Sequence, residues 1–344
     1  MQKYHATLDI SDARPKIQSI SEQLKQIPQI TQTTVADKDN FNKLLSQNST
    51  FENTDYGNSW SYILQGTFFG SYKYYDGKTI LAITTRYPGK TPFVIVKAAG
   101  KNYIEKIAEI ATKLRAISGE RVIVKNLTQD EFKKLQNYGF TDYLIGDCWS
   151  ERFKYDDDTY PEAIVHIPTV LALKGSKFKL LKYRINALRR RHRILVEKYT
   201  PIIFADGIKV WQKWSASFVK RFEKELKANP LDAHSIDLHR TYVERLSSIY
   251  DGKNVFSYTL YIDGEPHAFT LAEKVSPSTI GFYSNISSNT HQGLSELLLY
   301  EAFARAAQAG FTYANLGGSE FESLFNFKKK FAPKLVQKTH AILY

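Results

Sequence analysis

The sequence predicts an α/β (α+β) protein of two tandem units, each a mixed, mainly antiparallel sheet flanked by helices. Three observations favour this fold class. Strand and helix patterns alternate along the chain, both halves show the same order of elements, and a segment of unusual composition separates them. The 344 residues suffice for two domains, and an apolar content of 43% supplies two cores. We therefore place the units at residues 1–160 and 201–344, with a basic connecting segment at 161–200.

Periodicity predicts the elements of the first half. Short aromatic-rich segments, bounded by glycines and an Asp-Gly dipeptide, are typical of antiparallel strands. A helix, a β-branched strand and a second helix follow. Thr128 and Glu131 have the spacing of a capping box at the start of that second helix. The expected strands are 60–67, 68–75, 79–85, 92–97 and 121–125, and the expected helices are 17–27, 39–45, 102–117 and 128–138.

The second half follows the same order without an obvious sequence repeat. It contains helices at 208–226, 235–250 and 296–309 and strands at 255–262, 266–275, 280–284 and 313–316. Asp263 and Gly264 form the turn between the first two strands. An antiparallel meander that leads into a central helix and a further strand is the order of the GNAT acyltransferase superfamily. Both units are therefore expected to be GNAT-like.

The connecting segment is strongly basic. No acidic residue occurs from Ala163 to Val196, whereas solvated charged surfaces normally carry both signs. Ile185, Leu188 and Leu195 fall at helical intervals, which predicts one anchored face from which the cations project. Together with a formal net charge of +12, this pattern predicts phosphate binding, and an unspecialised basic helix is the alternative. The candidate residues are Lys182, Arg184, Arg189, Arg190, Arg191 and Arg193.

Residues 313–333 form the clearest functional candidate. Gly317 and Gly318 follow a short strand pattern, and residues without a Cβ allow a sharp turn and a close approach to a ligand. Ser319 is placed to cap the helix that follows. The stretch therefore predicts a strand, a tight turn and a helix beside a bound molecule.

The helix predicted after this turn is amphipathic. Leu324, Phe327 and Phe331 lie three to four residues apart, while Lys328 and Lys330 are expected to face elsewhere. An apolar anchor beside ammonium groups suits an anionic substrate. The alternative is an ordinary crossover helix with a solvated lysine face.

Three local signatures occur in a fixed order along the chain. They are 173–179 followed by 183–186, 293–296 at the start of an apolar helix, and 315–320 followed by 327–333. On these signatures the chain resembles the family of the phosphatidylglycerol lysyltransferase C-terminal domain, a tandem GNAT-like fold related to Fem-type aminoacyl transferases. The resemblance implies transfer of an aminoacyl group from aminoacyl-tRNA to an amine or hydroxyl of a small-molecule, peptide or lipid acceptor. The active site is expected in the C-terminal unit.

An activated ester donor leaves the protein three tasks, which are to align the acceptor, to stabilise the oxyanion and to remove a proton. Glu320 and His291 are the candidates for the general base, and Glu273 is a weaker one. Lys328 and Lys330 are candidates for neutralising charge on the donor. In a GNAT-like unit the donor lies between splayed central strands, here 280–284 and 313–316. The expected substrate-binding residues are Asn315, Gly317, Gly318, Ser319, Tyr283 and Gly293.

Other classes are excluded or remain as alternatives. A single cysteine excludes an internal disulfide framework, and the histidines have no recognised ligand spacing, so neither a metal nor a bound cofactor is expected. No apolar run approaches the roughly 18 residues of a membrane span, and no signal-peptide core is present. We expect a cytoplasmic protein, with peripheral membrane contact left open. The alternatives are an acyl-CoA-dependent N-acyltransferase, whose pyrophosphate loop 289–295 fits poorly, and a non-catalytic nucleic-acid-binding module.

Overall fold

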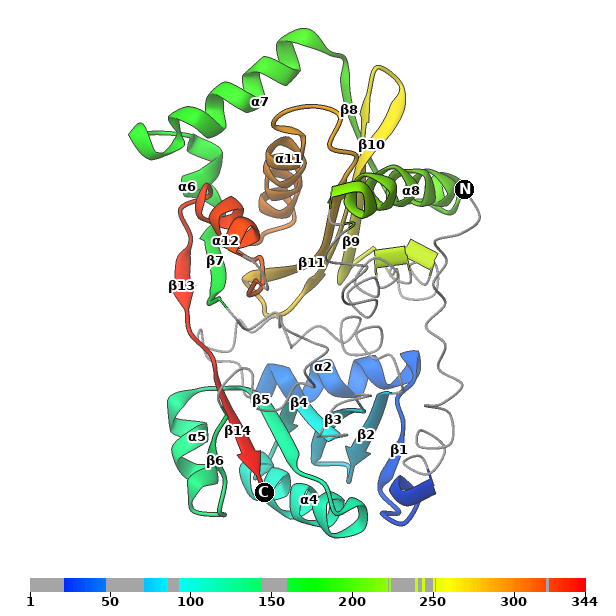
Figure 1. Ribbon diagram of the computed structural model, residues 1–344, viewed down its shortest axis with the longest axis vertical. Coiled ribbons are helices and arrows are strands. Elements are labelled where there is room, and N and C mark those ends of the chain that lie inside the picture. Colours follow the sequence, from blue (N-terminus) through cyan, green and yellow to red (C-terminus); the bar gives the residue numbers. More distant parts are fainter. Residues whose placement is uncertain are drawn as a thin grey trace. The chain divides into compact units, whose positions relative to one another are not determined.

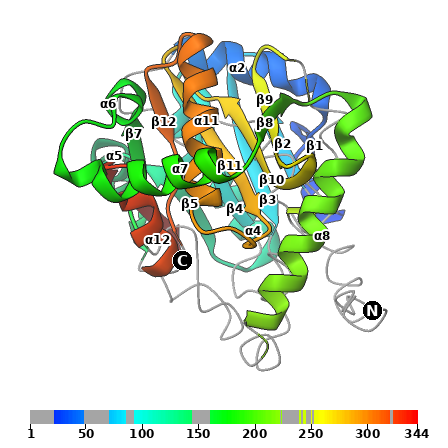
Figure 2. The ribbon, with the colours of Figure 1, turned by 90° about the horizontal axis from the view of Figure 1, so that it is seen from above.

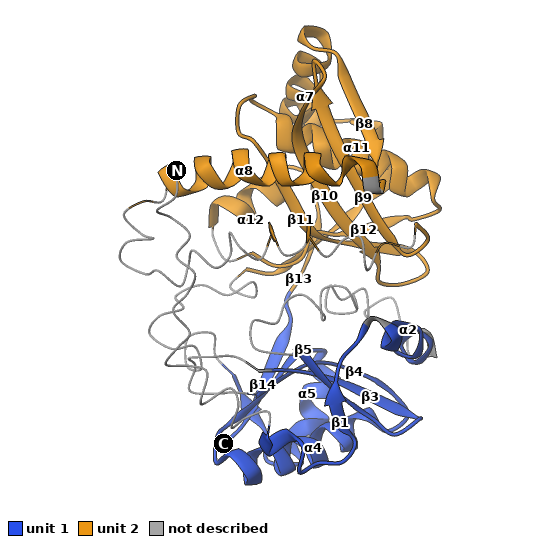
Figure 3. Cartoon of the chain, turned by 90° about the vertical axis from the view of Figure 1, so that its right-hand side faces the viewer, with its two compact units in different colours: residues 1–159, 337–344 blue, residues 160–336 orange. Residues whose placement is uncertain are grey.

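The computed structural model describes residues 22–47, 71–85, 93–143, 160–221, 223, 239–240, 243–244, 250, 252–319 and 322–344. The expected strand 60–67, residues 17–21 of the expected helix 17–27, most of the expected helix 235–250, and the candidate base Glu320 lie outside these ranges. The chain divides into two compact units (Figure 3). Unit 1 comprises residues 1–159 and 337–344, and unit 2 comprises residues 160–336.

Unit 1 has a seven-stranded sheet in the order β1-β2-β3-β4-β5-β14-β6 (Figure 1). The β4–β5 pair is parallel, and the other neighbours are antiparallel. The strands are β1 Ile30–Gln32, β2 Ser71–Tyr75, β3 Thr79–Thr85, β4 Phe93–Gly100, β5 Val122–Leu127, β6 Thr141–Asp142 and β14 Thr339–Leu343. The helices are α2 Lys38–Gln47, α4 Tyr103–Ser118 and α5 Gln129–Gln136, with a 3₁₀ turn η1 at Val35–Asp37.

Strand alternation gives unit 1 a core on each face of its sheet. Leu81 and Ile83 of β3 belong to the cluster that includes the buried face of α4. Ile80 and Ala82 alternate with them along the strand and pack in the cluster with Phe41 of α2. At the start of α5 the predicted capping box is confirmed, because Thr128 and Glu131 each bond the backbone amide of the other.

Unit 2 has a seven-stranded sheet in the order β13-β7-β12-β11-β10-β9-β8, with one parallel pair, β11–β12 (Figures 1 and 2). Its strands are β7 Glu162–His166, β8 Ile194–Lys198, β9 Val255–Ile262, β10 Glu265–Lys274, β11 Thr279–Ser287, β12 Tyr313–Asn315 and β13 Lys334–Val336. Its helices are α6 Ile167–Ala172, α7 Lys179–Arg191, α8 Phe204–Arg221, α11 Leu294–Gln308 and α12 Glu322–Lys329, with 3₁₀ turns η4 Ser176–Phe178 and η5 Pro201–Ile203. The predicted fold class of two mixed sheets flanked by helices is confirmed.

The basic segment 161–200 is built into unit 2 rather than lying between units, since it supplies β7, α6, α7 and β8. The anchored face of α7 consists of Leu181, Ile185 and Leu188. Leu195 does not extend that face, contrary to the prediction, because it lies on β8 and is 48% exposed. The helix ends at Arg191, and the backbone of His192 is already extended.

Unit 1 contains one strand from a segment that follows unit 2 in the chain, and the sheet of unit 2 begins with a strand from the basic segment. The C-terminal strand β14 pairs with β5 and β6 of unit 1. β7, which follows residue 159, pairs with β12 and β13 of unit 2. Residues 337–344 therefore belong to unit 1 and not to the C-terminal unit in which the sequence placed them. A short alternating strand shows which residues face a core, but it does not show to which sheet it belongs.

Candidate active site

The two central strands of unit 2 diverge. The parallel pairing of β11 with β12 ends at Gly281 and Asn315. β11 continues beside β10 as far as Ser287, whereas the chain after Asn315 turns to β7, where the amide of Leu316 donates to the carbonyl of Ala163 at 3.0 Å. This is the splay that the sequence predicted between these strands.

A β-bulge lies next to the divergence. Phe282 is opposite Ala272 and Ser284 is opposite Leu271, so Tyr283 is the extra residue of β11. Bulges turn backbone groups out of the regular ladder and are frequent beside active sites. Tyr283, a predicted substrate-binding residue, therefore lies at an irregular point of the sheet beside the divergence.

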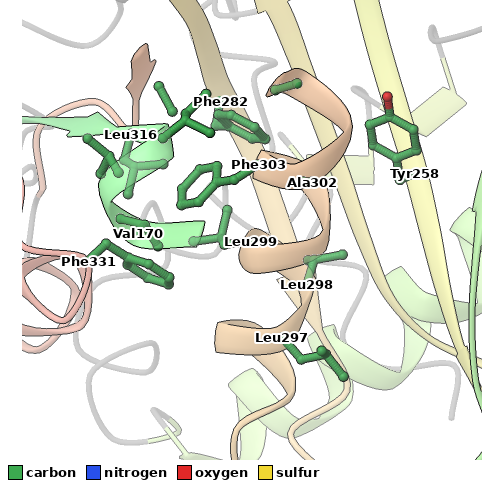
Figure 4. Close-up of a cluster of buried hydrophobic side chains, with 14 of the residues drawn as sticks. Val170, Tyr258, Phe282, Leu297, Leu298, Leu299, Ala302, Phe303, Leu316 and Phe331 are labelled. Carbon is green, nitrogen blue, oxygen red and sulfur yellow. The ribbon is translucent and has the colours of Figure 1, made fainter. Parts of the chain in front are cut away.

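The α11 side of this divergence is filled by apolar side chains. Figure 4 shows Phe282, Leu316 and Phe331 gathered around Phe303 of α11. The ring of Phe303 lies 5.5 Å, between centroids, from the rings of both Phe282 and Phe331. The α11 side of the diverging strands is therefore closely packed and apolar.

The opposite face of the sheet is unusually polar. Side chains alternate along a strand, so the residues between those that face α11 lie on the other side. They include six polar residues near the divergence that are at most 5% exposed: Glu162, Ser257, Thr259, Glu273, Ser284 and Asn315. We call these six residues the polar face. Because burial of polar groups is costly unless they are satisfied, such a concentration beside diverging strands marks the candidate site.

Asn315 fixes the turn that follows β12. Its Nδ2 donates to Oε2 of Glu162 at 2.9 Å, and its Oδ1 accepts from the amide of Gly317 at 2.7 Å. Gly317 has φ 70°, a left-handed conformation that favours glycine. Asn315 and Gly317 thus lie together as predicted. Glu162 was not predicted from the sequence. The feature that could have indicated it is a carboxylate at the start of an otherwise apolar strand.

Lys328 is buried against the same turn. Its side chain is the buried one of α12, and its Nζ donates to the carbonyls of Gly317, at 3.3 Å, and of Gly318. The expectation that Lys328 faces away from the anchored side is wrong. Two glycine carbonyls offer the ammonium group the acceptors that it needs once it leaves water.

Ser319 adds a second polar group beside this turn. Its side chain is 0% exposed, and Oγ has no hydrogen-bond partner among the described residues. The amide of Tyr160 donates to the carbonyl of Ser319 at 3.1 Å, and the ring of Tyr160 stacks on Phe325 at 4.9 Å between centroids. The backbone of Ser319 is thereby fixed while its hydroxyl keeps its bonding capacity.

Lys330 joins an ion-pair triad at the start of α11. Glu296, with a 5% exposed side chain, accepts from Lys330 at 2.8 Å and from Arg184 of α7 at 2.5 Å. Burial raises the pKa of the Glu296 carboxyl, but the bonds from Lys330 and Arg184 outweigh this and leave it below 4.5. A Cβ on Gly293, which has φ 89°, would lie 2.9 Å from Cβ of Arg184. Gly293 therefore allows α7 to approach the start of α11.

His291, in the loop before α11, contacts His192 from the end of α7 and His267 of β10. Its ring lies 4.9 Å from that of His192 and 5.0 Å from that of His267, between centroids. Its Nδ1 and the hydroxyl of Thr290 are 2.8 Å apart. His291 is thus brought together with other imidazoles, whereas Asn315, Gly317, Gly318, Ser319 and Lys328 share the turn after β12.

The basic candidates of α7 divide into two groups. Arg184 and Arg189 pair with carboxylates of α11, and the pair from Arg189 to Glu301 measures 2.5 Å. The remaining candidates are exposed and form no ion pair within the described part of the chain; they are Lys182, Arg190, Arg191 and Arg193. Cations that lack acidic partners are the ones available to an external polyanion.

Two other properties concern the described residues alone. No group of three or more His, Cys, Asp or Glu side chains in these residues is arranged to hold a metal ion. No helix in the same ranges has the length and hydropathy needed to cross a bilayer.

Comparison with known proteins now gives the family. Residues 49–344 match the family model described as phosphatidylglycerol lysyltransferase, C-terminal. The chain belongs to this family. The resemblance predicted from the sequence is therefore confirmed, and with it the enzyme class, an acyltransferase. No curated protein matches the sequence.

Proteins of known structure share the fold. A conserved protein of unknown function from Bacteroides thetaiotaomicron has a TM-score of 0.71 at 15% identity, covering 92% of this chain and 99% of its own. L-PGS from Bacillus licheniformis has a TM-score of 0.55 at 16% identity over 79% and 83% of the two chains. FemX has a TM-score of 0.52 at 12% identity over 91% and 96%. At these identities the likeness shows the fold alone.

Proposed function

We propose that this family member transfers an aminoacyl group from aminoacyl-tRNA to an amine or hydroxyl acceptor at the diverging strands of unit 2. The divergence of β11 from β12, with apolar packing on one side and the polar face on the other, carries the proposal. An ester carbonyl placed between the strands meets the bulge at Tyr283 and the turn at Gly317 and Gly318.

The transfer needs no redox partner. The acceptor nitrogen or oxygen attacks the carbonyl carbon, the ester C–O bond breaks, and the released 3′ hydroxyl takes a proton. Lys328 holds the glycine turn and Lys330 holds Glu296, so both ammonium groups act through the backbone and side chains that they fix. Ser319 offers its buried hydroxyl to the substrate. His291 and Glu320 stay candidates for the general base.

The exposed cations of α7 suit the phosphates of tRNA. Lys182, Arg190 and Arg191 project from a helix that has no acidic residue, so an RNA backbone meets unopposed positive charge. An RNA donor also fits a cytoplasmic reaction. The family description and L-PGS support a phosphatidylglycerol acceptor, and FemX is the reason for including a peptide acceptor in the tests.

Transfer itself is tested with total tRNA charged with radiolabelled amino acids. Phosphatidylglycerol vesicles and a lysine-containing peptide serve as acceptor probes, and we expect label to move to one of them. Label that stays on tRNA, or is released only to water at the background rate, contradicts the proposal. Consumption of acetyl-CoA in a parallel assay would favour the acyl-CoA alternative instead.

The tRNA surface is tested by binding at increasing salt. Replacing Lys182, Arg190 and Arg191 by Gln should weaken tRNA binding. In a plot of the logarithm of the association constant against the logarithm of the salt concentration, the slope should become shallower by about two to three, because each phosphate contact contributes about 0.7 to 0.9 to it. A control with the same charge change replaces Lys113, Lys133 and Lys134, which are exposed on unit 1. Equal effects of the two triple variants would show that net charge, and not this surface, binds the RNA.

A further inference from the structure

A histidine and a serine meet on the polar face. Nδ1 of His239 and Oγ of Ser284 are 3.0 Å apart. Ser284 is the first residue after the bulge at Tyr283, and its side chain is 1% exposed. His239 lies in a helical stretch of which the structure describes residues 239–240 and 243–244. The pair therefore lies one residue from the place where a donor carbonyl would meet β11.

Aromatic rings of α8 hold the imidazole. Trp214 meets the ring of His239 edge-on, with centroids 5.0 Å apart. Phe218 lies 5.2 Å from Trp214. Edge-to-face contacts restrict the orientation of a ring, so the direction of Nδ1 toward Ser284 is maintained by packing as well as by the hydrogen bond.

Access decides which groups an acceptor meets. The α11 side of the diverging strands is filled by Phe282, Phe303 and Leu316 (Figure 4). The polar groups that an acceptor attacking a carbonyl between β11 and β12 could use therefore lie on the polar face. Ser284 belongs to that face, as its register opposite Leu271 and its bond to His239 both show.

We propose that Ser284 and His239 form the proton relay for the acceptor, an inference that rests on the acyl transfer proposed above. The acceptor N–H or O–H gives its proton to Oγ of Ser284 as the new bond to the carbonyl carbon forms. The Ser284 hydroxyl passes its own proton to Nδ1 of His239. When the ester C–O bond breaks, the imidazolium returns a proton to the leaving 3′ oxygen through the same hydroxyl, and both side chains regain their starting state.

Imidazole suits this task better than the other groups of the polar face. Its ordinary pKa near 6.5 lets it accept and return a proton at neutral pH, whereas carboxylates release theirs more readily. Glu162 is moreover engaged in the bond that orients Asn315. The relay also leaves His291 in its own cluster of imidazoles, joined to His192 and His267.

The test measures transfer from total aminoacyl-tRNA to phosphatidylglycerol vesicles and to the lysine-containing peptide as a function of pH. His239→Gln should lower the transfer rate at least about 100-fold and remove the limb of the pH profile on which the rate rises with pH. Ser284→Ala should lower it about tenfold or more and flatten the same limb. Added imidazole should restore part of the rate of His239→Ala but not of Ser284→Ala.

Matched controls distinguish loss of the relay from loss of any hydroxyl or imidazole in unit 2. Ser287→Ala removes another buried hydroxyl of β11, one that contacts Ser295 of α11 and lies outside the polar face. His166→Gln removes an exposed histidine of unit 2, and both variants should transfer like the parent. Affinity for tRNA should be unchanged in every variant. Parent-like rates and pH profiles in Ser284→Ala would overturn the relay even if His239→Gln fails to fold. A parent protein that labels neither acceptor would instead overturn the proposed function.

Discussion

Unit 1 and unit 2 place a parallel strand pair at the same position of the sheet and differ in the residue that follows it. The pairing ends at Val124 in β5 and at Asn315 in β12. Two residues further on, unit 1 has Asn126 with φ 61° and unit 2 has Gly317 with φ 70°. The backbone has a positive φ at this position in both units, and the residues there differ in their side chains.

In unit 1 that side chain ties the strands together. Nδ2 of Asn126 donates to the carbonyl of Val96 in β4 at 3.3 Å, across the point where β4 and β5 part. Gly317 has no side chain, and its carbonyl accepts from Lys328. Each unit therefore has a pair of diverging strands. In unit 1 the side chain of Asn126 joins the two strands, whereas Gly317 has no side chain to do so in unit 2. This difference favours unit 2 as the place of the proposed transfer.

The starts of the central helices show a parallel difference. The N-cap of α4 is Asn102 with φ 55°, and the N-cap of α11 is Gly293 with φ 89°. A side chain at Gly293 would meet Arg184 of α7, whereas Asn102 is exposed. At both positions an asparagine in unit 1 corresponds to a glycine in unit 2. There Lys328 approaches the backbone of Gly317, and Arg184 approaches that of Gly293.

The most direct way to break this comparison is to give unit 2 the residue of unit 1. Gly317→Asn should keep the left-handed backbone, which Asn tolerates better than other residues with a side chain, and place an amide between the diverging strands. We expect transfer to fall about 100-fold, or about 2.7 kcal/mol in transition-state stabilisation, with a small change in melting temperature. Kinetics and thermal melts on the same preparation measure both quantities.

The reverse exchange in unit 1 is the control. Asn126→Gly removes the bond to Val96 and should cost about 1 kcal/mol of stability while transfer stays at the parent rate. If Asn126→Gly lowers transfer as much as Gly317→Asn does, the two divergences are not functionally different. The assignment of chemistry to unit 2 would then be wrong.

The second prediction concerns the lysine that holds the glycine turn. Lys328→Met keeps an unbranched apolar stem but leaves the carbonyls of Gly317 and Gly318 without their donor, at a cost of about 2 kcal/mol in the free energy of unfolding. Lys329, its exposed neighbour, should tolerate the same change within about 0.5 kcal/mol. Denaturant titrations of both variants decide the matter. Equal stabilities would mean that Lys328 has no structural role.

Lys328 also shows what can and what cannot be predicted from the sequence. The spacing of apolar residues and the turn residues predicted most of the described strands and helices. This works because apolar residues recur wherever one side of an element packs against a core. A lysine in a run of three reads as solvated from sequence, since its acceptors are carbonyls brought near by the fold. Local pattern contains no information about such distant partners.

The same limit explains the rest of the candidate site. Glu162 and Asn315 are 153 positions apart in the chain, and His239 and Ser284 come from a helical stretch and a strand that no motif connects. Asn315, Gly317 and Gly318 were found because they are contiguous and include a glycine pair. The strand register places Ser284, Asn315 and Glu162 on one face of the sheet, and a sequence pattern does not contain this register.

The smallest expected effect concerns the acids at the starts of the two central helices. Glu296 of α11 is buried between Arg184 and Lys330, whereas Glu105 in the first turn of α4 is exposed. Because the pKa of Glu296 is lower in the folded protein than its ordinary value of 4.5, its charge stabilises the fold above pH 4.5. That contribution is lost as pH falls through the lowered value.

Glu296→Gln should therefore cost about 1 kcal/mol at pH 7, a value reduced by the partial exposure of both cations. The difference between parent and variant should shrink as pH falls below 4.5 and should be smaller at high salt. Glu105→Gln makes the same charge change on α4 and should leave stability within about 0.5 kcal/mol at each pH. Melts of the three proteins from pH 3 to pH 7 test this. A Glu296→Gln deficit that is independent of pH would mean that shape rather than charge matters there, and the contrast between the helix starts would then rest on packing alone.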